Sequence, residues 1–399
     1  MLRMIGFEFK KMYANSVVTG SLAVLLLVCV LILQAYCFNS PAASVITPDG
    51  TQLSGREAIT FNQRIAEKYS GDFTDDTIAK MVSDFSADYP GEYAEMAEGG
   101  AVSAWIPSSY LSLAMFIPPA NYDEIAQNTA AHGTTVLPLT NAGLVSIQNY
   151  ETADVEEPLQ YGYDESWAAF FSGFCGQTIA IAFPALIVIL IAVSSIFSGE
   201  YSAKMDALIL ATRYGKSRQI TAKLFACMIF TTAVIGGMFL LFCIAFGVRY
   251  GILGWNADIQ TNFGLSLMEA DLSLNNLQLI LFGFGIVWLA GIFTAAVTAM
   301  ISSLTRSPFS SFILAFAVFI APWVIRRLLP ESILRDLMIV FPANAVNAHE
   351  ILLMSVNAQS IFCSQPFAPV LYLCFTAMTI ILISSVIAYK FFVTVQPSG

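Results

Sequence analysis

Charged side chains are scarce in this 399-residue sequence: Asp, Glu, Lys and Arg make up 12% of it, whereas hydrophobic residues make up 57%. Soluble globular proteins carry about 25% charged residues. A chain this long with half that fraction cannot cover its outside with polar groups, so the composition excludes an ordinary soluble fold and indicates lipid as the solvent. Lysine and arginine number only 18. Because phosphate backbones are bound by clustered basic residues, we expect no nucleic-acid partner.

The residue types that carry most enzyme chemistry are also few. The two histidines, His132 and His349, lie far apart, and the seven cysteines form no C-x-x-C pair, which argues against a metal or redox cofactor. No G-x-S-x-G or H-E-x-x-H motif occurs, which argues against a serine hydrolase or a zinc protease. We therefore expect no catalytic, cofactor-binding or metal site, and the chain is interpreted as a protein other than an enzyme.

Long uncharged runs dominate what remains. Six stretches of 19 to 39 residues contain no Asp, Glu, Lys or Arg, and about 20 mostly apolar residues suffice for a helix to cross a membrane. The sequence thus predicts an all-α polytopic membrane protein with six transmembrane helices. The fifth is the shortest and carries Pro322-Trp323 near its end. Their expected positions are 17–38, 167–197, 224–248, 277–303, 309–326 and 368–390. None holds an acidic residue, which weakens the case for an ion-driven carrier.

The basic residues indicate the orientation. With the N-terminus in the cytoplasm, ten lysines and arginines lie in short cytoplasmic segments. The short outer loops hold four basic residues: Arg249, Arg326, Arg327 and Arg335. Basic residues are expected to gather in cytoplasmic loops, and the adjacent Arg326 and Arg327 go against that rule. Six spans then place both termini in the cytoplasm. A signal peptide cleaved near Ala42-Ala43 is the alternative interpretation of the first span.

An acidic segment, 39–166, separates the first two spans. It holds 19 of the 28 acidic residues and four basic ones, which favours a solvated surface over attraction of a cationic ligand. Ser54 to Glu57 has the pattern of a capping box, and a second helix is expected after Thr74. Residues 133–149 are rich in β-branched residues and glycine, typical of short strands or loops. We predict a folded, mixed α/β extracellular domain.

The cytoplasmic loop at 198–223 contains Gly215-Lys216-Ser217, the last residues of a phosphate-binding loop. That motif needs a glycine five residues earlier, where this chain has Leu210, so we expect no nucleotide site. Glu200 and Lys204 are four residues apart, the spacing of a helical ion pair. The loop is therefore interpreted as a short amphipathic helix that contacts another protein. Pro184, in the second span, is a hinge candidate, with a static kink as the alternative.

Residues 196–226, "IFSGEYSAKMDALILATRYGKSRQITAKLFA", resemble the corresponding loop in permease subunits of the second class of ATP-binding cassette exporters, the type-V exporter architecture. Segment 1–16 resembles the family's elbow helix, segment 49–76 its external domains in Gram-positive bacteria, and "FPANAV" (341–346) its short external helices, here expected within 328–366. The matching positions begin with Phe197 and include Thr212-Arg213. The resemblance implies that six residues couple the chain to a separate ATPase subunit: Glu200, Lys204, Arg213, Lys216, Arg218 and Lys223.

The resemblance also implies a function: a permease in the bacterial cytoplasmic membrane that pairs with a second copy or a sister permease and exports its substrate with energy from the ATPase. Antimicrobial peptides or lipid-like compounds are the family's usual substrates. ATP would be bound by the partner alone. Two alternatives remain open: an ATPase-linked mechanical or sensory protein that moves no substrate, and an ion-driven carrier or channel.

Overall fold

The fold is described from a computed structural model. It is mostly helical and divides into two compact units: unit 1, Met1–Leu33, Phe171–Ile244 and Leu281–Gly399, and unit 2, Gln34–Phe170 and Ala245–Ile280. The structure describes residues 1–40, 44–88, 94–96, 102–104, 110, 113, 116, 145–147, 158–176, 180–205, 218–268, 270 and 272–394.

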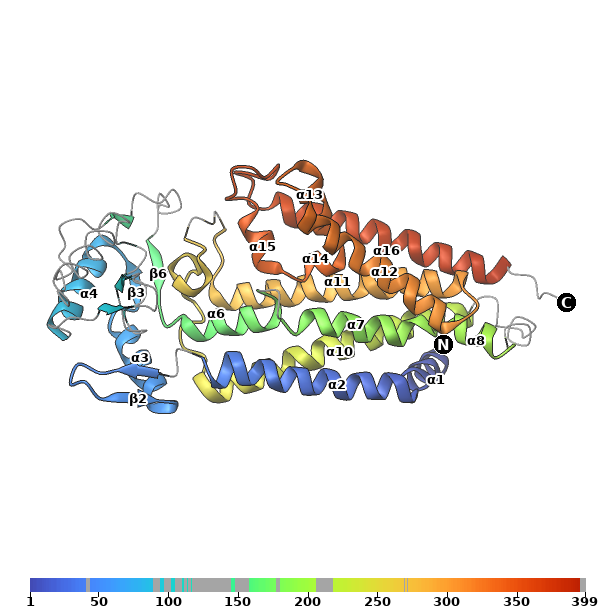
Figure 1. Ribbon diagram of the computed structural model, residues 1–399, viewed down its shortest axis with the longest axis horizontal. Helices are drawn as coiled ribbons and strands as arrows, with labels where there is room; N and C mark the ends of the chain where they lie inside the picture. The colour runs from blue at the N-terminus through green and yellow to red at the C-terminus, as the bar shows by residue number, and fades with distance from the viewer. Residues whose placement is uncertain are drawn as a thin grey trace. The chain divides into compact units, whose positions relative to one another are not determined.

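Five apolar helices are long enough to cross a membrane, which indicates a multi-pass membrane protein (Figure 1). They coincide with five of the six predicted spans, because long uncharged runs leave helix as the structure that satisfies every backbone group in lipid. In chain order they are α2 (Ser16–Leu33, continued by the π-helix η1, Gln34–Phe38), α10 (Arg218–Tyr250), α11 (Asn276–Leu304), α12 (Pro308–Leu328) and α16 (Ala368–Thr394). The predicted N-terminal segment forms α1 (Leu2–Tyr13).

The second predicted span is not one continuous helix, which corrects the expectation for 167–197. Helix α6 (Glu165–Phe171) passes into a π-helix, η6 (Ser172–Gly176), and a new helix, α7 (Ala182–Ser194), follows. Two glycines in η6 lower its helix propensity. The 13 residues of α7 extend only about 20 Å, shorter than the roughly 30 Å hydrocarbon core.

Pro184 lies in the first turn of α7. A proline there leaves no helical hydrogen bond unmade, since the first amides of a helix have no partner within it. The interruption precedes Pro184, and its role as a hinge remains a prediction. Helix α7 packs against α2 and α12 and buries residues on all sides, including Ala185, Leu186, Ile189 and Val193. An apolar surface all round is the pattern of a central helix.

Short helices follow α12 at the predicted place, 328–366. They are α13 (Ile333–Leu337), the 3-10 helix η9 (Met338–Val340), α14 (Pro342–Ala345) and α15 (Ala348–Leu353). Helix α14 and η9 pack against α12, and α15 packs against α16. Pro342 occupies the first position of α14, where proline favours a helix start.

Unit 2 contains the small sheets. Strands β1 (Ser44–Ile46) and β2 (Gln52–Ser54) pair antiparallel, as do β3 (Gly71–Phe73) with β6 (Leu159–Tyr161) and β4 (Ala94–Met96) with β5 (Val102–Ala104). The two predicted helices are α3 (Arg56–Lys68) and α4 (Asp75–Asp88). The apolar face of α4 is buried: Ile78, Met81, Val82 and Phe85. Most of 133–149, where strands or loops were expected, lies outside the described residues.

The predicted capping box is wrong. Ser54 ends β2, and Gly55 takes the N-cap position of α3 with a φ of 62° and no side-chain cap. Ser54 therefore belongs to the strand and not to the helix N-terminus that the motif predicted. A residue with positive φ is needed to turn the chain from β2 into α3, and glycine adopts such a φ readily.

Unit 2 also includes the connection between α10 and α11, which extends the predicted domain of 39–166 by residues 245–280. The backbone amide of Gln160 donates to the Asp258 carboxylate (2.7 Å), and the Asp258 amide donates to the Gln160 carbonyl (2.8 Å). Trp167 Nε1 donates to the Leu253 carbonyl (2.7 Å). These bonds attach the connection along β6 and the chain that follows it.

The buried carboxyl of Glu165 is expected to make the stability of unit 2 depend on pH. Burial and then the nearby Asp164 carboxylate raise the pKa of Glu165 well above its usual value, and Glu165 Oε2 has no partner among the described atoms. Because the pKa of Glu165 is higher in the folded state than in the unfolded state, the protonated carboxyl favours folding. This stabilisation is fully present below the unfolded pKa of about 4.3 and is lost as pH rises through the folded value. Glu165→Gln should stabilise unit 2 by roughly 1–2 kcal/mol at pH 7, measured by thermal unfolding between pH 5 and pH 8.

Asp84 supplies a control of opposite sign. Burial works to raise the pKa of Asp84, but hydrogen bonds from Lys68 (2.7 Å) and Tyr69 (2.6 Å) outweigh it, and the net pKa is lowered. Asp84→Asn should therefore lose stability near neutral pH and lose little in acid. Equal pH profiles for both variants and the wild type would contradict the assignment.

Candidate functional site

A buried lysine joins three helices at one end of unit 1. Lys223, in the first turns of α10, has a side chain that is 0% exposed. Its ammonium group lies 3.0 Å from Glu8 Oε2 of α1, 2.5 Å from Glu200 Oε1 of α8 (Ser198–Ser202) and 3.0 Å from the Ile196 carbonyl. An ammonium has three donors, so each N–H of Lys223 has one acceptor. We call Glu8, Lys11, Glu200 and Lys223 the Lys223 cluster.

The charges of the Lys223 cluster balance. Glu8 and Glu200 are 3% and 2% exposed, and Lys11, half-exposed on α1, lies 3.2 Å from the same Glu200 oxygen that Lys223 holds. Two cations thus face two anions. Burying charges in this way is costly unless each is paired and hydrogen-bonded, and that requirement fixes α1 against α8 and α10.

The turn between α7 and α8 is held by a hydroxyl from α11. Ser302 Oγ accepts from the backbone amides of Phe197 (3.1 Å) and Ser198 (3.0 Å) and donates to the Ser194 carbonyl (2.8 Å). Backbone groups left free by a helix break need such partners when buried. The break at 195–197 is therefore a satisfied, fixed turn.

Aromatic side chains extend the contact to α16. The Phe392 ring lies 5.0 Å from the Phe197 ring and 5.5 Å from the Tyr201 ring, centroid to centroid. The Lys223 ammonium also lies 5.8 Å from the Phe197 centroid. Helices α1, α8, α10, α11 and α16 consequently meet around one short segment, 196–201.

The predicted coupling residues fall into three groups. Glu200 and Lys223 are buried in the Lys223 cluster. Lys204 and Arg218 are exposed, on either side of residues 206–217. Arg213 and Lys216 belong to the stretch 206–217 of the predicted coupling loop, which lies outside the described residues.

The expected Glu200–Lys204 helical pair is wrong. Helix α8 ends at Ser202, and Lys204 follows the C-cap with a φ of 54°, in the left-handed region. The described ion pairs of Glu200 go to Lys11 and Lys223 instead. A residue beyond the end of a helix no longer lies one turn above its fourth neighbour, so the spacing rule does not apply.

Sequence reasoning missed Glu8 and Ser302. Glu8 is the single acidic residue in a basic amphipathic segment, and Lys223 stands at the border of a long apolar span. Isolated charges of opposite sign at such borders indicate that an ion pair forms. The sequence does not select Lys223 as the partner of Glu8, because several other basic residues occupy similar positions. Ser302 gives no signal of its own, because serines are common in apolar helices.

Comparison of the chain with models of known protein families, with curated proteins and with solved structures finds no match.

Proposed function

We propose that the chain is the membrane-spanning permease subunit of an ATP-driven exporter, moved by a separate ATPase subunit that contacts residues 198–223. The observation that carries the proposal is the Lys223 cluster. It ties α8, which is the first part of the proposed contact segment, to the surface helix α1 and to the first turns of the spanning helix α10.

Mechanical coupling needs a stiff connection between the loop that is pushed and the helices that move. Helix α8 is bonded to α10 by a buried ion pair and to α11 by the Ser302 hydroxyl, so a displacement of the loop would move both spans together. In this proposal Glu200 and Lys223 position the loop, whereas Lys204, Arg213, Lys216 and Arg218 are the direct contacts of the ATPase.

Helix α1 suits a position along the membrane surface. It buries Glu8 and exposes Leu2 (83%) and Phe7 (68%), the reverse of a helix in water. Apolar side chains exposed on an amphipathic helix with a basic last turn fit the lipid interface. We place α1 and both termini on the cytoplasmic side of the bacterial membrane, with a second permease beside this one.

The direct test is co-purification with an ATPase. The isolated chain should hydrolyse no ATP, and pull-down of the tagged chain from membranes that contain its ATPase should recover hydrolysis. Arg213→Glu with Lys216→Glu should lower the recovered ATPase by about tenfold or more, because reversed charges oppose a complementary surface. Arg306→Glu is the matched control, since Arg306 is exposed and lies outside the loop. Equal recovery of ATPase activity with the wild type, the double variant and the Arg306→Glu control would contradict the assignment.

Substrate flux separates export from mechanical signalling. Inside-out vesicles with the complex should accumulate substrate only with ATP, and reversal of Arg213 and Lys216 should abolish that accumulation. A complex that hydrolyses ATP and moves none of the cationic peptides or amphiphiles offered would favour the mechanical alternative. Flux that persists without ATP and is sensitive to an ionophore would favour an ion-driven carrier.

A further inference from the structure

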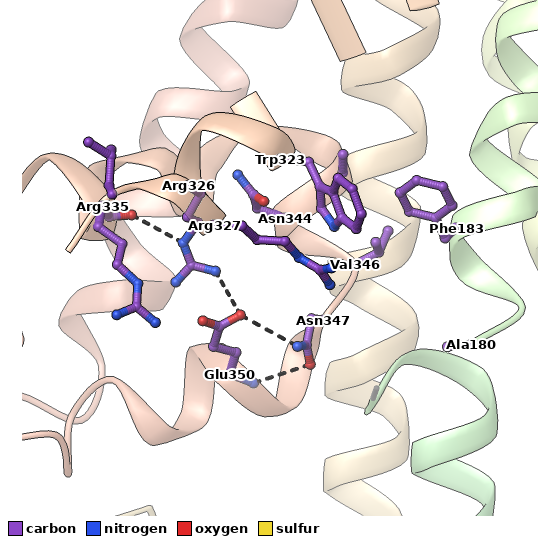
Figure 2. A pocket seen from close by; sticks show the side chains of 12 residues that line it. Ala180, Phe183, Trp323, Arg326, Arg327, Arg335, Asn344, Val346, Asn347 and Glu350 are labelled. Carbon is purple, nitrogen blue, oxygen red and sulfur yellow. Dashed lines mark hydrogen bonds and ion pairs between the residues drawn. The ribbon is translucent and has the colours of Figure 1, made fainter. Parts of the chain in front are cut away.

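A cationic cavity lies in unit 1 where the end of α12 meets the short helices that follow it (Figure 2). Its volume is about 380 Å³, within the range of ~300–1,000 Å³ usual for small-molecule sites. Trp323, Arg326 and Arg327 come from α12, Arg335 from α13, and Asn344 from α14. We call these five residues and the space between them the arginine cavity.

The arginine cavity has an excess of positive charge. Three arginines line it, against a single carboxylate, Glu350. A neighbouring cavity of about 330 Å³ shares Arg326, Arg335 and Glu350 but adds Glu331 and Asp336, so its acidic residues outnumber its arginines. The two cavities differ in sign although they share a wall, and the arginine cavity is the one suited to an anion.

Two of the arginines are fixed by the protein. Arg326 is 7% exposed, and it donates from Nε to the Arg335 carbonyl (3.1 Å) and pairs through Nη1 with Glu350 Oε2 (2.7 Å). Arg335 makes a surface pair with Glu331 (3.3 Å). Figure 2 shows Arg326 directed toward Glu350, with Arg335 beside it. Glu350 therefore neutralises one arginine and orients it.

Arg327 is the arginine with uncommitted charge. Its guanidinium lies 3.9 Å from the centre of the Trp323 ring, a stacked cation–π contact (Figure 2). No carboxylate of the described residues lies within ion-pair distance of it. Stacking occupies the face of a guanidinium and leaves the N–H groups along its edge to donate. A planar fork held in this way matches the oxygens of a phosphate.

The position of the cavity points to an amphiphile. Helix α12 begins beside α8, near the Lys223 cluster, and ends beside α14. Its 21 residues span about 30 Å, the thickness of a hydrocarbon core. Near the cavity α12 exposes three large apolar residues, Val324, Ile325 and Leu328, beside the exposed Arg327. A ligand with its anionic group among the arginines could lay its apolar part along this face.

Two ordinary explanations account for part of the arrangement. Cations are favoured at the last turn of a helix, and arginines near the end of a span reach toward the membrane surface. Both explain why Arg326 and Arg327 lie in the last turn of α12. Neither explains why Arg335, from a different helix, lines the same space, nor why a buried arginine is held there beside its carboxylate partner.

We propose that the arginine cavity binds the phosphate group of an anionic lipid, with Arg327 as its principal donor and Trp323 as the platform that holds Arg327. Arg335 is the second donor, which exchanges its surface pair with Glu331 for the phosphate. The shared chemistry is that of a phosphate oxyanion, and the experiment separates its two sources, a lipid headgroup and the free ion. Binding to the isolated chain needs no ATPase, so its result is independent of the proposed export function.

The test titrates the full chain, purified in a phosphate-free non-ionic detergent at fixed salt, with dioctanoyl phosphatidic acid, dioctanoylglycerol and inorganic phosphate in separate experiments. Calorimetry measures the affinity, and thermal unfolding measures stabilisation by the ligand. We expect one site for phosphatidic acid and no saturable binding of dioctanoylglycerol. Arg327→Gln and Arg335→Gln should each weaken binding by about tenfold or more, the loss for one charge-assisted hydrogen bond.

Arg306→Gln is the matched control, because it removes the same charge from an exposed position just before the other end of α12. It should leave the affinity within about twofold of the wild type, since no hydrogen bond to the ligand is lost. Equal weakening by Arg306→Gln and Arg327→Gln would overturn the proposal, as would saturable binding of dioctanoylglycerol. Inorganic phosphate bound as tightly as phosphatidic acid, with the same arginine dependence, would support the phosphate site and identify the free ion as its ligand.

Discussion

Replacing Lys223 by methionine should lower the free energy of unfolding by about 3–5 kcal/mol. Methionine preserves most of the apolar stem but removes the ammonium, which leaves Glu8 and Glu200 buried against each other, with Lys11 alone to offset them. It also leaves the Ile196 carbonyl without the partner described for it. Equilibrium unfolding of the detergent-purified chain measures the loss.

The matched control is Lys204→Met, which removes the same charge from an exposed position four residues after Glu200. It should change stability by less than about 0.5 kcal/mol, as expected for a surface substitution. A second comparison isolates the cause: in the Lys223→Met background, changing Glu8 and Glu200 to glutamine should restore part of the loss, because no uncompensated charge remains. Similar losses for Lys223→Met and Lys204→Met would show that the Lys223 cluster does not hold the helices.

Gly254→Ala should destabilise unit 2 by about 3 kcal/mol or more, since overpacking adds to the strain of a positive φ. Gly254 has a φ of 72°, and a Cβ built there would overlap the Tyr163 backbone carbonyl. Backbone cannot move aside as a flexible side chain can. We expect the substitution to increase the unfolding of unit 2, which limited proteolysis or hydrogen exchange measures.

Gly251→Ala separates strain from overlap. Gly251 is in the same connection with a φ of 77°, but a Cβ there meets nothing within 4 Å. It should lose about 1 kcal/mol, the usual cost of the unfavourable backbone region alone. Equal protection of both variants against exchange would mean that residues 245–280 are not packed on β6 as described.

Five spanning helices could be predicted because each rests on a local property, a long run of uncharged residues. The interruption after α6 could not, because 167–197 is just as apolar, and the break depends on how Gly173 and Ile181 meet: the Ile181 amide donates to the Gly173 carbonyl (3.0 Å). The membership of Asp258 in unit 2 also depends on a distant strand. Hydropathy carries no information about such pairings.

The candidate site was predictable in its residue types and not in its geometry. Glu200 and Lys223 could be selected from the loop, but Glu8 lies 215 residues before Lys223 and only the fold brings them together. Burial then changes the role assigned to the pair, from contacts on a surface to supports beneath it. Arg326 and Arg327, which went against the orientation bias, instead line a cavity that includes Arg335 from another helix.

Because unit 2 is assembled from two separate stretches of chain, its completion depends on the order of synthesis. When β6 leaves the ribosome, Asp258 has not yet been made. The Gln160 amide and carbonyl therefore lack their hydrogen bonds to Asp258 until α7 and α10 have been synthesised. A chain stalled before residue 258 would present that edge unprotected, which makes it a target for chaperones and proteases. Completion of unit 2 thereby reports that the chain has been synthesised at least through α10.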